Sequence, residues 1–124
     1  MPKKPLSPKA PILVVEDDGL VRTVAVDMLE DAGFDVLEAS SADAAWTILE
    51  RTPGVGALFT DIDMPGSMDG LALAGCVAKR WPDIRLVVTS GGKGLRDAEV
   101  PDHGRFLLKP YRQDHLIEAI VAAA

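Results

Sequence analysis

The sequence has a single cysteine and no long apolar run. Because Cys76 has no second cysteine to pair with, an intramolecular disulfide framework and a multi-cysteine zinc site are excluded. No window of about 18 uninterrupted apolar residues occurs, so the sequence predicts no membrane-spanning helix. The amino-terminal residues also lack the apolar segment of a signal peptide. Together these absences lead us to expect a protein of a reducing compartment, the cytoplasm.

Positive charge is scarce as well. Lys and Arg number 13 against 19 Asp and Glu, which gives a net charge of −6 at pH 7. This is the wrong sign for neutralising phosphates, so we expect no nucleic-acid partner. Residues 1–11 hold three lysines, four prolines and no acid, and we interpret them as a flexible basic tail. Residues 12–124 then carry ten basic and nineteen acidic side chains, a net charge of −9, and their number fits one folded domain.

Short apolar runs alternate with segments of helical periodicity along this domain. The pattern predicts helices near 20–32, 41–49, 70–80 and 116–121, and strands at 12–15, 34–38, 55–60, 84–89 and 105–108. Strands that are apolar on both faces, each followed by a helix, indicate an α/β fold with a doubly wound five-stranded parallel sheet. Residues 91–104 contain four glycines and a proline, so we expect a short or irregular fourth helix there.

Polar side chains follow four of the predicted strands. In such folds, ligands bind beyond the carboxyl ends of the strands. Crowded carboxylates need a neutralising cation, and hard oxygen ligands suit Mg²⁺, with Mn²⁺ as an alternative. A carboxylate beside a metal, a hydroxyl and an ammonium group forms a site for phosphoryl transfer, with the carboxylate as nucleophile. The residues in question are Glu16, Asp17 and Asp18, then Asp61 and Asp63, then Ser90 and Gly91, and finally Lys109 and Pro110.

From residue 12 to the carboxyl terminus, these motifs resemble the response-regulator receiver domain of bacterial two-component signalling. Residues 12–18 (Ile-Leu-Val-Val-Glu-Asp-Asp) resemble its first-strand acidic motif, and residues 61–70 its phosphoacceptor loop. Thr89-Ser90-Gly91 resembles the switch position, and residues 106–110 the lysine-proline motif. The resemblance implies a flavodoxin-like (βα)5 fold with strand order 2-1-3-4-5.

The resemblance also assigns roles to individual residues. It implies that Asp61 accepts the phosphoryl group, that Lys109 is its pairing cation, and that Ser90 and Phe106 act as switch residues. The peptide between Lys109 and Pro110 is expected to be cis. The implied metal ligands are Asp17, Asp61, Glu16 through water, and the backbone carbonyl of Asp63. We interpret Asp18 as a helix cap, and Trp46, Trp81 and Cys76 as packing residues.

The sequence thus leads us to expect a stand-alone receiver, without an output domain, that is not an enzyme. It would accept phosphate from a histidine kinase or a histidine phosphotransferase in a Mg²⁺-dependent step and switch a protein-interaction surface. We expect a monomer or weak dimer with no membrane partner.

Two alternatives remain. One is a degenerate receiver that binds partners without phosphorylation. The other is an aspartate-nucleophile phosphatase, because Asp61-Ile62-Asp63 also resembles the haloacid-dehalogenase motif. In that phosphatase family the motif lies on the first strand, whereas here it follows the third.

Two features depart from the receiver pattern. The loop between Pro65 and Asp69 is one residue longer than its commonest form. The segment expected to form the fourth helix is short and rich in glycine. In the receiver family the surface that contacts partners is usually formed by the fourth and fifth helices with the fifth strand, and the second departure alters this surface. We hypothesise that residues 93–100 become ordered on phosphorylation or on partner binding.

Overall fold

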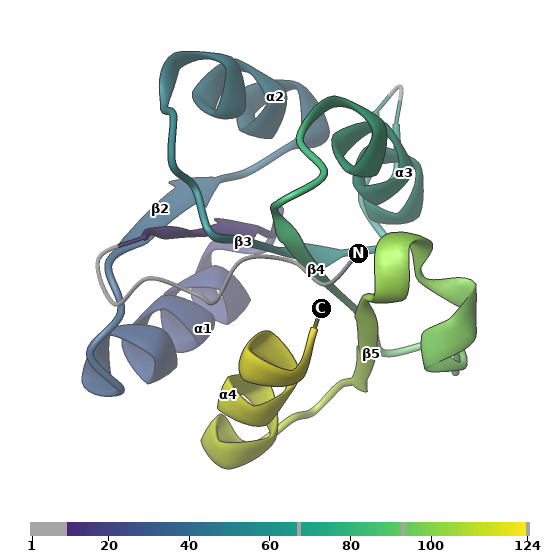
Figure 1. The fold of residues 1–124 in the computed structure, drawn as a ribbon. Coiled ribbons are helices and arrows are strands. Elements are labelled where there is room, and N and C mark those ends of the chain that lie inside the picture. The colour runs from purple at the N-terminus through teal and green to yellow at the C-terminus, as the bar shows by residue number, and fades with distance from the viewer. Residues whose placement is uncertain (1–9, 67, 93, 124) are drawn as a thin grey trace.

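A computed structural model describes residues 10–66, 68–92 and 94–123 (Figure 1). Its centre is a parallel sheet whose strands follow the order β2-β1-β3-β4-β5. This confirms the predicted doubly wound α/β fold and its strand order. The strands are β1 (Ile12–Val15), β2 (Val36–Ala39), β3 (Ala57–Asp61), β4 (Arg85–Ser90) and β5 (Arg105–Leu108).

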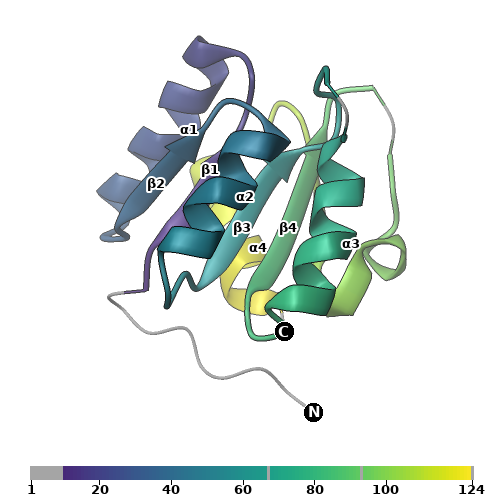
Figure 2. The same ribbon diagram turned by 90° about the horizontal axis from the view of Figure 1, so that it is seen from above.

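Helices cover both faces of the sheet. The helices are α1 (Gly19–Asp31), α2 (Ala42–Arg51), α3 (Gly70–Arg80) and α4 (Gln113–Ala122). The helices α1 and α4 lie on one face, and α2 and α3 lie on the other (Figure 2). In β1, Leu13 and Val15 pack towards α2 and α3, while Ile12 and Val14 pack towards α1. All four side chains are buried, which explains why the strand is apolar throughout.

Polar caps begin three of the helices. As expected, Asp18 caps α1, and its carboxylate accepts hydrogen bonds from the backbone N–H groups of Leu20 (2.9 Å) and Val21 (3.1 Å). Ser41 caps α2 and Asp69 caps α3 in the same way.

The residues interpreted as packing residues lie on or beside helices. Trp46 and Trp81 stack edge to face, with 4.9 Å between ring centroids, against the core on the α2–α3 side. Cys76 is half-buried on α3.

The second strand starts two residues later than predicted, at Val36, and ends one residue later, at Ala39. The backbone N–H of Phe34 bonds to the carbonyl of Leu29 at 3.1 Å, so Phe34 closes the end of α1 instead of entering the sheet. Two other strands end one residue later than predicted. Asp61 pairs with Thr89, and Ser90 pairs with Leu108, inside the sheet. The polar residues expected after these strands are therefore their last members.

The fourth helix is irregular, as predicted. Two single 3₁₀ turns, η1 (Asp97–Glu99) and η2 (Pro101–His103), take its place between β4 and β5. Asp102 and His103 have positive φ angles of 58° and 60°, which an α-helix does not accommodate. The segment is anchored by Val100, whose side chain is 3% exposed and belongs to the core.

Three predictions involve residues outside the described part of the chain. These are most of the basic tail (residues 1–9), the longer acceptor loop at Ser67, and the first residue of the 93–100 segment. Among the described residues, no helix is both long and apolar enough to cross a membrane.

Candidate functional site

The carboxyl ends of four parallel strands bring the predicted site residues to one edge of the sheet. Glu16 follows β1, Asp61 ends β3, Ser90 ends β4, and Lys109 follows β5. Since β1, β3, β4 and β5 are consecutive neighbours in the sheet, their ends converge. The expected peptide between Lys109 and Pro110 is cis, which confirms that prediction.

Three carboxylates form a compact acidic cluster. One carboxylate oxygen each from Glu16, Asp17 and Asp61 lies within 4.8 Å of the others. Glu16 is 5% and Asp61 4% exposed, whereas Asp17 faces solvent. Two buried oxygen donors beside one that is open to water match the needs of a hard divalent cation that keeps part of its hydration shell. The residues therefore fit Mg²⁺ or Mn²⁺.

Lys109 supplies the positive charge next to this cluster. Its Nζ lies 2.7 Å from Oε1 of Glu16 and 3.3 Å from Oδ2 of Asp61. Burial opposes the charged ammonium, but the hydrogen bond to Glu16 and the charges of Asp61 and Glu16 outweigh it and raise the pKa of Lys109. One ammonium group thus serves two buried carboxylates.

Burial also determines the direction of the pKa shift of Glu16. Removal from water raises the pKa of its carboxyl group, and the neighbouring charge of Asp61 adds to this effect. The hydrogen bonds from Lys109 and from the backbone N–H of Asp18 offset only part of it. Three carboxylates thus lie beside one ammonium group, so the cluster has a place for a further positive charge.

Ser90 is joined to Asp63. Its hydroxyl donates a 2.6 Å hydrogen bond to Oδ2 of Asp63 and accepts one of 3.2 Å from the backbone N–H of Gly92. The backbone N–H of Asp63 in turn donates to Oδ1 of Asp61 at 3.2 Å. The sequence did not predict this side-chain link, although pairing of β3 with β4 brings the carboxyl ends of both strands together. The expected role of the Asp63 carbonyl as a metal ligand stays a prediction.

Two further residues shape the site: Arg22, which no motif included, and Gly70, which lies in the acceptor-loop motif but was given no role of its own. Arg22 of α1 donates from one guanidinium nitrogen to the Glu16 carbonyl at 2.7 Å, and from Nε to Glu38 at 3.2 Å. Gly70 begins α3 so close to β3 that a Cβ atom there would lie 1.8 Å from the carbonyl oxygen of Asp61. Arg22 thus holds the loop of Glu16, and Gly70 lets α3 pack against the backbone of Asp61.

Phe106 lies on the edge strand β5, half-buried against the core on the α2–α3 side. Its backbone N–H donates a 2.9 Å hydrogen bond to Oδ1 of Asp97 in η1. The irregular segment that replaces the fourth helix therefore contacts the strand of Phe106 directly. Its expected movement as a switch stays a prediction.

Comparisons with known proteins agree with this geometry. A family model described as the response regulator receiver domain matches residues 12–121. The hydrogenase transcriptional regulatory protein HoxA of Cupriavidus necator is 38% identical over 121 residues, covering 90% of this chain but only 23% of HoxA. The response regulator receiver protein CpdR of Brucella abortus is 32% identical, covering 88% of this chain and 92% of CpdR. A crystal structure of the receiver domain of the hybrid histidine kinase CckA matches with a TM-score of 0.73 and 31% identity, covering 88% of this chain and 94% of that domain.

Proposed function

The chain belongs to the response regulator receiver domain family, and on this premise we propose that it is a phosphoacceptor whose Asp61 receives a phosphoryl group from a phosphohistidine. The observation that carries the proposal is the surrounding of Asp61. Its buried carboxylate lies 3.3 Å from the ammonium of Lys109 and within the acidic cluster of Glu16 and Asp17. A cluster that attracts a divalent cation and an ammonium group therefore meet at one carboxylate.

In the proposed transfer, an oxygen of Asp61 attacks phosphorus while the bond from phosphorus to the donor imidazole breaks. The imidazole nitrogen leaves and takes up a proton, and the product is an acyl phosphate on Asp61. Bound by Glu16, Asp17 and Asp61, Mg²⁺ would supply positive charge to the phosphoryl oxygens. Lys109 already contacts Asp61, so its ammonium is placed to pair with the same group after transfer.

In this proposal, phosphorylation changes the hydrogen-bond partner of Ser90. Its hydroxyl donates to Asp63 in this structure, and rotation towards a phosphoryl group on Asp61 would exchange that acceptor for a more highly charged one. We propose that Phe106 then moves inward on β5. Its contact with η1 would transmit this movement to the 91–104 segment.

The phosphodonor in this proposal is a histidine kinase or a histidine phosphotransferase. The similarity to the receiver domain of a hybrid histidine kinase supports that class of partner. This chain spans less than a quarter of HoxA and nearly all of CpdR, so a downstream partner is not assigned. A cytoplasmic location, a monomeric or weakly dimeric state and the lack of enzymatic turnover stay predictions from the sequence.

The test is incorporation of radioactive phosphate from acetyl phosphate or from a phosphorylated histidine kinase. We expect labelling with Mg²⁺, none with EDTA, and none in Asp61→Asn. The matched control is Asp83→Asn, which removes an exposed carboxylate at the opposite end of the sheet and should label normally. Label that persists in Asp61→Asn, or that is indifferent to EDTA, would contradict the assignment. A folded protein that takes no label from either donor would favour the degenerate receiver.

A further inference from the structure

The amino-terminal segment has a regularity that the proposed function does not use. Prolines occur at every third position, as Pro2, Pro5, Pro8 and Pro11. A polyproline II helix has three residues per turn, so this spacing places all four rings on one face. The residue before each proline is also restricted to extended conformations. The sequence therefore strongly favours a polyproline II helix with one proline face.

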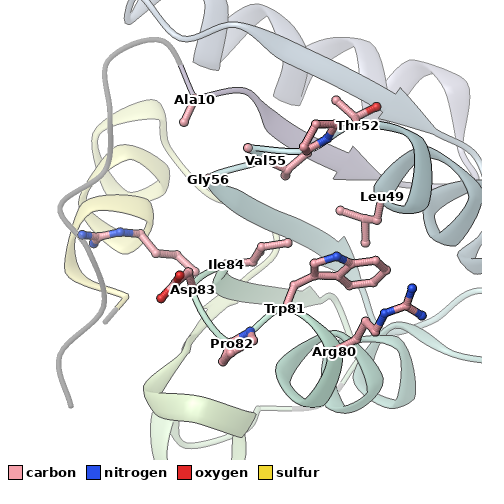
Figure 3. Close-up of a pocket in the computed structure, with 13 residues that line it drawn as sticks. Ala10, Leu49, Thr52, Val55, Gly56, Arg80, Trp81, Pro82, Asp83 and Ile84 are labelled. Carbon is pink, nitrogen blue, oxygen red and sulfur yellow. The ribbon is translucent and has the colours of Figure 1, made fainter.

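A pocket of about 450 Å³ lies where this segment joins the sheet (Figure 3). It is at the amino ends of the strands, at the opposite edge from Asp61. Its apolar lining includes Leu49, Val55, Trp81 and Ile84, and Ala10 forms part of its wall. The size is within the range of pockets that bind a compact ligand.

The aromatic side chain of this pocket is held in place from two sides. The ring of Trp81 stacks edge to face on Trp46 with 4.9 Å between centroids, and the guanidinium of Arg80 lies 4.9 Å from its centroid. Arg80 is also 3.9 Å from the carboxylate of Glu50. Trp81 is therefore a fixed aromatic side chain in the lining of an apolar hollow, and aromatic-lined grooves are the surfaces on which proline-rich segments dock.

We propose that residues 1–9 of the same chain turn back at Ala10 and dock their proline face on Trp81 in this pocket. The chain bends at Ala10, and Pro11 is already fixed because its carbonyl accepts a 2.9 Å hydrogen bond from the backbone N–H of Gly56. Nine residues of polyproline II helix extend about 28 Å, which is ample to cross the pocket. The occupant is thus tethered at the rim of its own site.

The net negative charge of the rest of the chain favours a basic occupant, although the pocket lining itself contains two arginines and one aspartate. The segment carries three lysines and no acid, while residues 12–124 have a net charge of −9. Of the charged residues in the pocket lining, Arg80 is engaged with Trp81 and Glu50, and Arg85 donates to the carbonyls of Val121 and Ala123 at 2.6 and 2.7 Å. Asp83 is exposed at the same rim and is positioned to pair with a lysine of the segment.

The test is nuclear magnetic resonance on the full chain. We expect nuclear Overhauser effects between the Trp81 indole protons and the ring protons of Pro5 or Pro8. A Pro5→Ala/Pro8→Ala variant lacks these ring protons, so its readout is the Trp81 indole resonance, which should shift when the docked proline face is removed. The control, Lys4→Ala/Ser7→Ala, makes the same number of alanine substitutions between the prolines and should retain the effects. Absence of these contacts in the unaltered chain, or a Trp81 indole resonance that is unchanged in the proline variant, would overturn the proposal.

A mixture of isotopically labelled and unlabelled chains identifies the source of the docked segment. Contacts confined to one chain support docking in cis. Contacts between labelled and unlabelled chains would show that a second copy supplies the segment and would overturn the proposal. All these substitutions lie outside residues 10–124, so a failure to fold is not expected to obscure the result.

Discussion

Replacing either of two glycines of α3, Gly70 or Gly75, by alanine should have opposite effects on the free energy of unfolding. At Gly70, a Cβ atom would lie 1.8 Å from the carbonyl oxygen and 2.6 Å from the carbonyl carbon of Asp61. Both are backbone atoms of a buried strand, and they cannot rotate away as a side chain would. At Gly75, in the middle of the same helix, an added Cβ atom meets nothing within 4 Å.

The magnitudes follow from these surroundings. Overpacking a rigid site costs about 1–3 kcal/mol, and the short distances at Gly70 place Gly70→Ala near the upper end, at roughly 2–3 kcal/mol of lost unfolding free energy. Replacing glycine by alanine in an open helix interior gains up to about 1 kcal/mol, because glycine loses more backbone entropy on folding. The two variants should therefore differ by about 3 kcal/mol.

Urea unfolding followed by circular dichroism measures both variants. Gly70→Ala should lower the midpoint and Gly75→Ala should raise it, with unchanged slopes. Phosphate incorporation should also fall in Gly70→Ala, since relief of the contact displaces the backbone of Asp61. If Gly70→Ala keeps the unfolding free energy within about 0.5 kcal/mol of the unaltered chain and labels normally, the close packing of α3 on β3 is refuted.

Three further predictions concern separate parts of the molecule. Burial raises the pKa of Tyr111 to about 12 from an ordinary 10.0, because the folded chain favours the neutral phenol. The contribution of Tyr111 to the free energy of unfolding should therefore be complete below pH 10 and be lost as the pH rises towards 12. Urea midpoints across this range should fall less in Tyr111→Phe, and equal falls would contradict the assignment. Asp18→Ala should lower the unfolding free energy by about 1 kcal/mol through loss of the α1 cap, while Asp18→Asn should retain most of it; a thermal melt that does not separate the two argues against the cap. Amide exchange in residues 94–100 should slow when beryllofluoride mimics the phosphoryl group, and strong, equal protection in both states would exclude ordering on phosphorylation.

Local sequence patterns were sufficient to predict most of the fold. Apolar runs buried on both faces indicated a parallel sheet, and the glycines of residues 91–104 indicated the irregular fourth helix that η1 and η2 replace. The main error was local too. Phe34 is apolar and adjoins a strand, but its N–H group closes α1. An apolar pattern does not distinguish a residue within a strand from one that closes the end of a helix, because the pattern indicates burial and not hydrogen bonding.

The sequence by itself determined which residues stand at the carboxyl ends of the strands, because chain order and strand periodicity are local properties. Only the tertiary structure decided which of them touch. Lys109 contacts Glu16 across 93 positions of sequence, and Ser90 is bonded to Asp63 across 27. Contacts of about 3 Å depend on strand register, helix packing and rotamers throughout the core, and no short segment of sequence encodes them. The acidic motif was therefore visible in the sequence, whereas the pairing of its charges became visible only in the folded chain.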